Sequence, residues 1–139
     1  MQWELIQSSP EIIEYIDNTL GDFNKSQVNY NSKMDYLPLN FHIKDEAGSI
    51  IAGINAFACW QMLWVNELYV DEHYRRKKLG ALLLAKIEQD AKQFGCLMVQ
   101  TFTFDFQAKD FYLKSGYEVF GVIDNCPEGH QCVYLKKAL

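Results

Sequence analysis

Four consecutive cations stand immediately before an apolar helical pattern that begins at about Leu79. A strand, a short loop and the first turn of a helix together form a binding site for anions, because unpaired backbone N–H groups and the positive end of the helix dipole converge there. Gly80 leaves room for a close approach of backbone or ligand, since it has no Cβ atom. The residues therefore favour a phosphate-bearing ligand over a solvated basic turn. The four cations that would compensate two linked phosphates are Arg75, Arg76, Lys77 and Lys78.

The same cations are compatible with a nucleic-acid contact, but the overall charge argues against it. The chain has 13 lysine and arginine residues against 18 aspartate and glutamate residues, which gives a net charge of -5. Affinity for long nucleic acids comes mainly from the neutralisation of phosphates. We therefore expect no nucleic-acid partner.

The cysteines and histidines lack the spacing of a metal site. No C-x-x-C pair and no H-x-x-x-H pair occurs among them, so we expect no metal and reduced structural thiols. Two of the histidines are expected at the surface, and the third, His130, is either a turn residue or part of the acceptor side if the last hairpin folds over the site. The residues concerned are Cys59, Cys96, Cys126, Cys132, His42, His73 and His130.

At the cation run the sequence resembles the GNAT superfamily of acetyl-CoA-dependent N-acetyltransferases. The signature of that family is Arg or Gln, two residues, Gly, one residue and then Gly or Ala, preceded by a strand that ends in Leu-x-Val. The matching residues here are Leu68, Val70, Arg75, Lys78 and Gly80. Lys78 departs from the signature, which has glycine at that position.

A second motif of the family lies further along the chain. It consists of Asn, then Ala three residues later, then an apolar residue and Tyr, followed by a glycine and an aromatic residue that begin the next strand. An aspartate replaces the Asn here, and the order and spacing are otherwise those of the family, so the resemblance covers nearly the whole chain. The counterparts are Asp105, Ala108, Phe111, Tyr112, Gly116 and Tyr117.

The resemblance implies acetyl-CoA as the co-substrate. Backbone N–H groups around Leu68 and Val70 would bind the thioester oxygen and the pantetheine amides, provided that this strand is bulged and has unpaired groups. The amides of residues 76–81 would bind the pyrophosphate. The full set of expected cofactor-binding residues is Leu68, Tyr69, Val70, Arg75, Arg76, Lys77, Lys78, Leu79, Gly80, Ala81, Asp105, Ala108, Phe111 and Tyr112.

Two residues are candidates for catalysis. Tyr112 stands where the family places the tyrosine that hydrogen-bonds the sulfur, and a phenol with a reference pKa of about 10 can protonate a departing thiolate. Glu67 resembles the carboxylate that takes the proton of the amine directly or through water. The alternatives are a core aromatic for Tyr112 and a solvent-facing strand residue for Glu67. Asp105 is expected first of all to cap the helix that follows it.

Hydrophobic periodicity predicts the elements that position these residues. It indicates a strand over 1–7, a helix from Pro10 to Gly21, a loop or a broken short helix over 22–35, a β-hairpin over 37–60 that turns at 45–48, and a strand over 62–70. A helix over 79–95, a strand over 97–104, a short helix within 105–116 and closing strands over 117–123 and 131–139 follow. We expect one α/β (α+β) domain over 1–139, with a mixed, mostly antiparallel sheet flanked by helices. The resemblance adds that the sheet splays between the fourth and fifth strands.

The function expected from these features is transfer of an acetyl group from acetyl-CoA to a primary amine of a small molecule or peptide, by direct attack in a ternary complex. The alternatives are a domain that only binds or senses acyl-CoA, and a nucleic-acid binder that uses residues 75–78. Family members act on antibiotics, polyamines, amino acids, ribosomal N-termini and protein lysines. Segments 22–35 and 124–130 are expected to select the acceptor, and the acidic balance favours a cationic one.

The location and assembly of the protein follow from weaker signals. No apolar run reaches the roughly 18 residues of a membrane span, and the N-terminal residues lack the basic and apolar regions of a signal peptide. We expect a cytoplasmic protein without a membrane partner. A homodimer through the C-terminal strands is a further possibility.

Overall fold

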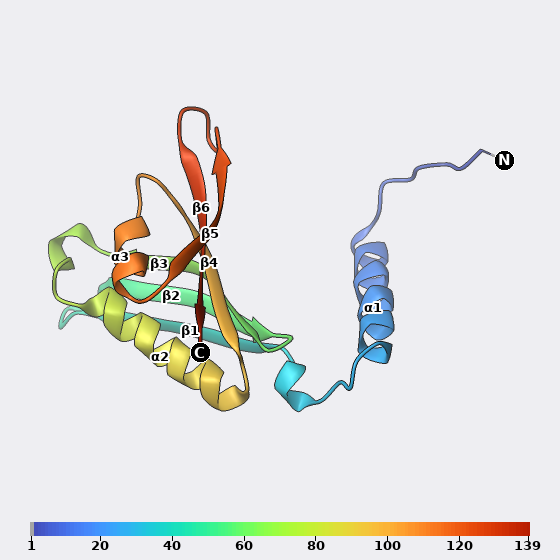
Figure 1. The fold of residues 1–139 in the computed structure, drawn as a ribbon, viewed down its shortest axis with the longest axis horizontal. Coiled ribbons are helices and arrows are strands. Elements are labelled where there is room, and N and C mark those ends of the chain that lie inside the picture. Colours follow the sequence, from blue (N-terminus) through green and yellow to red (C-terminus); the bar gives the residue numbers. More distant parts are fainter. Residues whose placement is uncertain (1) are drawn as a thin grey trace. The chain divides into compact units, whose positions relative to one another are not determined.

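The computed structural model describes residues 2–139, which divide into two compact units, residues up to 32 and residues 33–139 (Figure 1). The second unit holds the sheet and the helices that carry the two motifs. Within residues 2–139, none of the helices has the length and apolarity that crossing a membrane requires. The elements are α1 (Pro10–Ser26), η1 (Ser32–Met34), β1 (Leu37–Lys44), β2 (Ile50–Cys59), β3 (Met62–Val70), η2 (Glu72–Tyr74), α2 (Leu79–Phe94), β4 (Met98–Phe104), α3 (Lys109–Lys114), β5 (Glu118–Asp124) and β6 (Gln131–Ala138).

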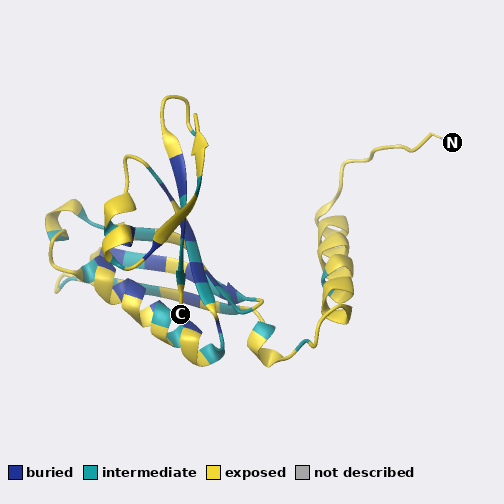
Figure 2. Ribbon diagram, viewed as in Figure 1, coloured by how far each residue is buried: buried dark blue, intermediate teal, exposed yellow. Residues whose placement is uncertain are grey.

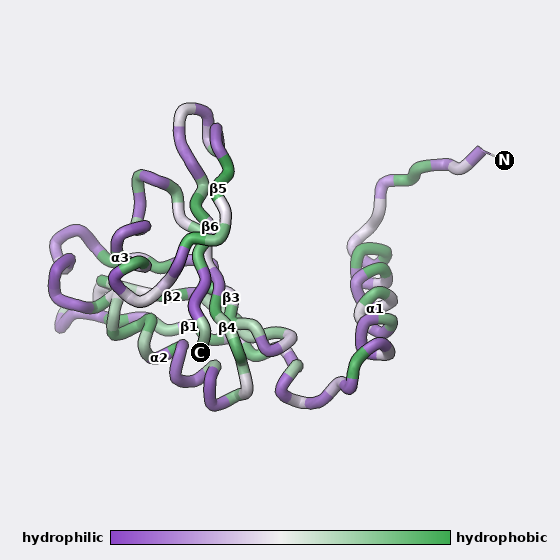
Figure 3. Tube along the Cα trace, in the orientation of Figure 1, coloured by the Kyte–Doolittle hydropathy of each residue, from purple (hydrophilic) through white to green (hydrophobic). Residues whose placement is uncertain are grey.

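The first unit consists mainly of α1. Ser9 is its N-cap and accepts a hydrogen bond from the Ile12 amide, and Pro10 stands in the first turn, as the sequence predicts. The helix does not end at Gly21 but continues to Ser26, because the apolar stripe resumes at Phe23 and one interior glycine costs only about 1 kcal/mol. Figure 3 shows apolar and polar positions alternating along this helix.

The strand predicted over residues 1–7 is wrong for its described part. Met1 lies outside the described residues, and residues 2–9 belong to no strand. Alternation of apolar and polar residues is necessary for a half-buried strand, but a strand also needs a hydrogen-bonded neighbour. Of the loop or broken short helix predicted over 22–35, the structure has the broken helix, since α1 includes residues 22–26 and η1 includes residues 32–34.

The described residues form a six-stranded sheet in the order β1-β2-β3-β4-β6-β5. Of its strand pairs, β3 with β4 is parallel and the others are antiparallel, which confirms the mixed, mostly antiparallel sheet. The predicted fourth and fifth strands are β3 and β4, since the N-terminal strand does not form. Asp45 supports the β1–β2 turn by accepting hydrogen bonds from Ser49 and Gly48.

The core of the second unit lies between α2 and one face of the sheet, and α2 extends across β1, β2 and β3 (Figures 1 and 2). Every second residue of β2 from Ala52 to Ala58 is buried against this layer, as the two-residue period of a strand requires. Gly95 ends α2 in a left-handed conformation, with φ of 116°, as the sequence predicts. The largest fully buried side chains are Ile54, Leu63, Ile87, Leu135, Val99 and Val133.

The contribution of this core can be measured on two residues of α2. We expect Ile87→Ala to lower the free energy of unfolding by about 2–5 kcal/mol, because Ile87 is fully buried and its removal leaves a cavity. Leu82→Ala is the matched control in the same helix, since Leu82 is 62% exposed, and should change the free energy by less than about 0.5 kcal/mol. Urea denaturation measures both, and equal losses would contradict this position of the core.

Candidate functional site

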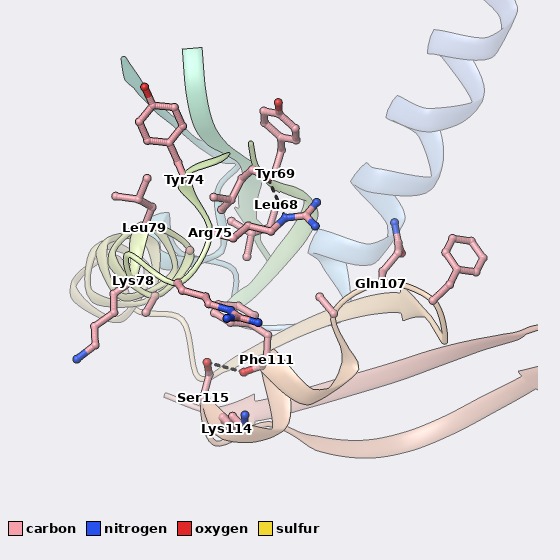
Figure 4. Close-up of a pocket in the computed structure, with 16 residues that line it drawn as sticks. Leu68, Tyr69, Tyr74, Arg75, Lys78, Leu79, Gln107, Phe111, Lys114 and Ser115 are labelled. Atoms are coloured by element: carbon pink, nitrogen blue, oxygen red, sulfur yellow. Dashed lines mark hydrogen bonds between the residues drawn. The ribbon is translucent and has the colours of Figure 1, made fainter. Parts of the chain in front are cut away.

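The parallel strands β3 and β4 separate halfway along their length. They are paired from Met62 with Met98 to Val65 with Thr101, although β3 continues to Val70 and β4 to Phe104. A cleft of about 970 Å³ is lined by the far end of β3, by the loop and first turn of α2, and by α3 with the loop that joins it to β4 (Figure 4). The splay predicted between the fourth and fifth strands is thus present. The lining residues are Leu68, Tyr69, Val70, Tyr74, Arg75, Arg76, Lys78, Leu79, Gly80, Ala81, Phe106, Gln107, Ala108, Phe111, Lys114 and Ser115.

A β-bulge accompanies the separation. Glu67 pairs with Asn55 and Val65 with Ala56, so that Asn66 has no counterpart on β2. The Ala56 amide donates instead to the side-chain oxygen of Asn40, at 3.1 Å. The bulge on which the expected backbone binding groups depend is therefore confirmed.

Beyond the bulge, alternate backbone groups of β3 point into the cleft. The Asp71 amide donates to the Ile51 carbonyl of β2 at 2.8 Å, so the residues in phase with Asp71 point toward β2. Leu68 and Val70 are out of phase and direct their N–H and C=O groups to the opposite side. Consistent with this, the Val70 carbonyl accepts a contact of 3.5 Å from Arg75 Nε.

The loop before α2 combines left-handed residues with a free helix end. Asp71 begins it by accepting a hydrogen bond from the His73 amide, which lowers the pKa of that carboxyl. Arg76 and Lys78 have φ of 66° and 62°, a conformation that costs non-glycine residues roughly 1–2 kcal/mol each. Lys78 is the N-cap of α2 and provides no side-chain cap, so the first amides of the helix remain available to an anion.

The left-handed conformation explains why the family signature has glycine where this chain has Lys78. The family has glycine there, and glycine is the residue that adopts a positive φ without strain. Lys78 lines the cleft, whereas its neighbour Lys77 does not and instead places its ammonium 5.3 Å from the ring centre of Tyr74. Three of the four cations of the run therefore line the cleft.

Gly80 permits close packing between α2 and α3. A Cβ atom at this position would lie 3.4 Å from two ring carbons of Phe111 and 3.7 Å from a methyl group of Val70. The first turn of α2 thus rests against the end of β3 and against the aromatic residue of the second motif. Both motifs meet at this point, as the resemblance implied.

Tyr112 is located behind the cleft wall, at the vertex where the strands separate. Its side chain is buried, and its hydroxyl forms a hydrogen bond with Thr101, whose own hydroxyl donates to the Val65 carbonyl at 3.1 Å. Burial raises the pKa of the Tyr112 phenol above its usual value, while the bond with Thr101 opposes this increase. The phenol therefore retains its proton at neutral pH.

A second buried tyrosine, Tyr117, packs against Tyr112. Tyr117 is 5.2 Å from Tyr112 between ring centres and donates a hydrogen bond of 2.8 Å to Glu88 of α2. Lys137 of β6 approaches the same carboxylate at 3.0 Å. Burial and the charge of Glu88 raise the pKa of Tyr117, so this residue is a neutral structural link between α2, α3 and β6.

Glu67 projects from the face of the sheet opposite α2. Leu68 and Val70 pack against the core, so their alternate neighbour Glu67 points the other way and is exposed. It does not line the cleft.

Asp105 does not cap α3, which corrects the expectation from its position. The N-cap of α3 is Ala108, without a side-chain bond, and the Ala108 amide donates instead to Thr103 Oγ1 at 3.1 Å. Asp105 accepts a hydrogen bond of 2.9 Å from the Gln131 amide and contacts His130 Nδ1 at 2.9 Å. The Asp105 carboxylate therefore bonds to residues 25 and 26 positions away along the chain and not to the first turn of α3.

Most of the residues expected to bind the cofactor line the cleft. Of the expected cofactor-binding set, Lys77, Asp105 and Tyr112 do not line the cleft, and the others do. Within residues 2–139, none of the four cysteines forms a disulfide, and no metal-binding group of three or more His, Cys, Asp or Glu side chains occurs. Cleft residues without a motif to identify them are Tyr74, Phe106, Gln107, Lys114 and Ser115.

Comparison with known proteins identifies relatives with one kind of activity. The model of the acetyltransferase (GNAT) family matches residues 6–117. Blasticidin-S acetyltransferase of Streptomyces morookaense is 38% identical over 95 residues, which are 68% of this chain and 70% of that protein.

Solved structures give the same result. The crystal structure of an acetyltransferase from Bacillus cereus ATCC 14579 superposes with a TM-score of 0.89 at 31% identity, over 99% of this chain and 98% of that chain. A protein of Bacillus anthracis str. Ames, assigned as a streptothricin acetyltransferase and solved in complex with acetyl coenzyme A, has a TM-score of 0.65 at 21% identity over 73% of this chain and 63% of its own. At that identity the likeness concerns the fold alone.

The strain at Lys78 leads to a prediction on stability. We expect Lys78→Gly to raise the free energy of unfolding by up to about 1 kcal/mol, because relief of the left-handed strain outweighs the greater freedom of glycine in the unfolded chain. Lys77→Gly is the matched control, since Lys77 is not among the residues with positive φ, and should lower it by roughly 0.5–1 kcal/mol. Urea denaturation of both variants decides, and destabilisation by Lys78→Gly would contradict the strain.

Proposed function

The chain belongs to the GNAT family of acetyltransferases and is an acyltransferase, and on this basis we propose that it transfers an acetyl group from acetyl-CoA to a primary amine of a small molecule. The reaction proceeds by direct attack of the amine on the thioester in a ternary complex. Residues 1–139 act in this proposal as one acetyltransferase domain, which is supported by a family match that crosses the boundary between the two compact units.

One observation carries the proposal. A split between parallel strands and a cationic helix N-terminus open onto the same cleft, so one elongated ligand can meet both. The outward-facing backbone groups of Leu68 and Val70 suit the amides and carbonyls of a pantetheine arm. The free amides at the start of α2, together with Arg75, Arg76 and Lys78, suit a pyrophosphate. Acetyl-CoA has this order of groups.

The chemistry assigns a role to each candidate. The amine nitrogen forms a bond to the thioester carbon, the bond from that carbon to sulfur breaks, and the thiolate needs a proton. In the proposal Tyr112 supplies this proton, which is supported by its place at the vertex of the split. The raised pKa keeps the phenol protonated until a thiolate forms, although it also makes the phenol a weaker acid. Glu67 accepts the proton of the amine, directly or through water, and its exposed position on the outer face is compatible with this role.

The acceptor is proposed from chemistry and from the relatives. The protein from Streptomyces is named for acetylation of blasticidin S, and the protein from Bacillus anthracis is assigned to streptothricin. The net charge of -5 favours the approach of a cationic molecule, because a negative field concentrates cations near the protein. We therefore place the acceptor among cationic small molecules that carry a primary amine.

The binding of acetyl-CoA can be tested at Gly80. We expect the protein to bind acetyl-CoA one-to-one in calorimetric titration, and Gly80→Glu to weaken binding at least tenfold, because a carboxylate in the first turn of α2 would repel the pyrophosphate proposed to bind there. Gly80→Ala is the control for packing, since its methyl group meets the same contacts with Phe111 at 3.4 Å and Val70 at 3.7 Å without adding charge. Equal losses in both variants would indicate packing rather than charge. Salt-sensitive binding of a DNA duplex without acetyl-CoA binding would instead support a nucleic-acid function.

The role of Tyr112 predicts a separation of binding from turnover. We expect Tyr112→Phe to lower kcat about 10²-fold or more while the Kd for acetyl-CoA stays within about twofold, because only the departing thiolate needs the phenolic proton. Tyr117→Phe is the control for loss of a buried hydroxyl and should destabilise the protein without this fall in kcat. Release of CoA, followed with a thiol reagent, gives the rate. An unchanged rate constant in Tyr112→Phe would remove the residue from the mechanism.

A further inference from the structure

A row of aromatic rings follows β4 away from the vertex of the split. Phe102 and Phe104 are 6.0 Å apart between ring centres at 81°, and Phe104 stacks on Phe106 at 5.3 Å and 15°. The imidazole of His130 stands edge-on to Phe106 at 5.1 Å and 85°. We call these four residues the aromatic row. Phe106 lines the cleft, so the row connects with the proposed acetyl-CoA site.

The row starts on the same face of the sheet as Glu67. Thr101 and Thr103 are buried on the α2 side, and the alternation along β4 therefore directs Phe102 and Phe104 to the opposite face. Glu67 projects from that face on β3, on the other side of the split. From Phe102 to Asp105 the chain covers about 10 Å, at ~3.3 Å per residue.

A hydrogen-bonded pair closes the far end of the row. Asp105 is held on β6 by three contacts, since it accepts from the Gln131 amide and His130 Nδ1 and donates its own amide to the Gln131 carbonyl at 3.0 Å. When Nδ1 carries the proton toward Asp105, Nε2 keeps a lone pair that can accept a hydrogen bond. The side chain of His130 is 48% exposed, so a solute can reach it.

We infer that the aromatic row and the Asp105–His130 pair recognise the acceptor, and that they select a molecule in which a flat unsaturated ring separates the amine to be acetylated from a second amino group. This inference rests on the proposed function and specifies its substrate class. The ring lies against Phe102 and Phe104, the reacting amine is at the Glu67 end, and the second amino group donates to His130 Nε2 beside the Asp105 charge.

Three simple amines separate the two parts of this recognition. Para-xylylenediamine has a flat ring between two amines, benzylamine lacks the second amine, and hexamethylenediamine lacks the ring. We expect kcat/KM for para-xylylenediamine to exceed that for each of the others by about tenfold, the effect of one aromatic contact or one charge-assisted hydrogen bond. Equal values for the three amines would overturn the inference.

Variants assign each part to its residues. Phe104→Leu should lower kcat/KM for para-xylylenediamine and benzylamine about three- to tenfold and leave hexamethylenediamine within about twofold. Phe120→Leu is the comparison variant, because this half-exposed phenylalanine of β5 reaches the row only through Tyr134, and it should change the three values much less than Phe104→Leu does. His130→Gln and Asp105→Asn should remove the preference for para-xylylenediamine over benzylamine. A uniform loss with all three amines would mean a structural role and overturn the inference.

Saturation-transfer NMR gives a readout that does not need turnover. In the presence of CoA, para-xylylenediamine should bind the wild-type protein, and binding should weaken in Phe104→Leu and in His130→Gln. Ring-dependent binding without any acetylation would overturn the proposed function and leave the recognition site in place. Acetylation of all three amines with equal binding would overturn the recognition site and leave the proposed function in place.

Discussion

The early separation of β3 from β4 is the constraint on which the rest of the site depends. Two parallel strands normally satisfy each other's backbone groups along their full length, and here the pairing stops at Val65 and Thr101. The bulge at Asn66 turns β3 away from its neighbour, and Asn40 supplies the acceptor that the Ala56 amide would otherwise lack. The unpaired groups that remain on β3 are then available to a ligand with alternating amides and carbonyls.

The proposed pyrophosphate site at the start of α2, over residues 75–81, depends on packing as much as on charge. Two residues of the loop adopt a left-handed conformation, and this strain is offset by the Asp71 cap on one side and by the contact between Gly80 and Phe111 on the other. The positive side chains lie around amides that the helix itself cannot satisfy. In the proposed site, charge would attract the anion and backbone geometry would determine where it binds.

Local patterns in the sequence explain what could be predicted. The helix over 79–94 was visible because its apolar period, its glycine cap and the cation run coincide, and Gly80 could be assigned to a close approach because it has no Cβ atom. The prediction of an N-terminal strand was wrong for the described residues because alternation of apolar and polar residues does not indicate whether a neighbouring strand is present. The prediction that Asp105 caps α3 was wrong because a carboxylate before a helix can bond locally or at long range. Its actual partners are 25 and 26 residues away. Cleft residues such as Gln107 and Ser115 carry no pattern at all, since only the fold brings them together.

The contacts of Asp105 divide the β5–β6 hairpin into an anchored base and a tip that extends beyond these contacts. Its three contacts with His130 and Gln131 tie the base of the hairpin to the end of β4, and the turn that follows Asp124 extends beyond them. Residues 125–129 form the tip, and none of them lines the cleft. Length and composition in the tip can therefore change while the donor site stays intact. In an evolving lineage, or in a laboratory library, the tip of this hairpin is a place where changes of sequence carry a low risk to the fold.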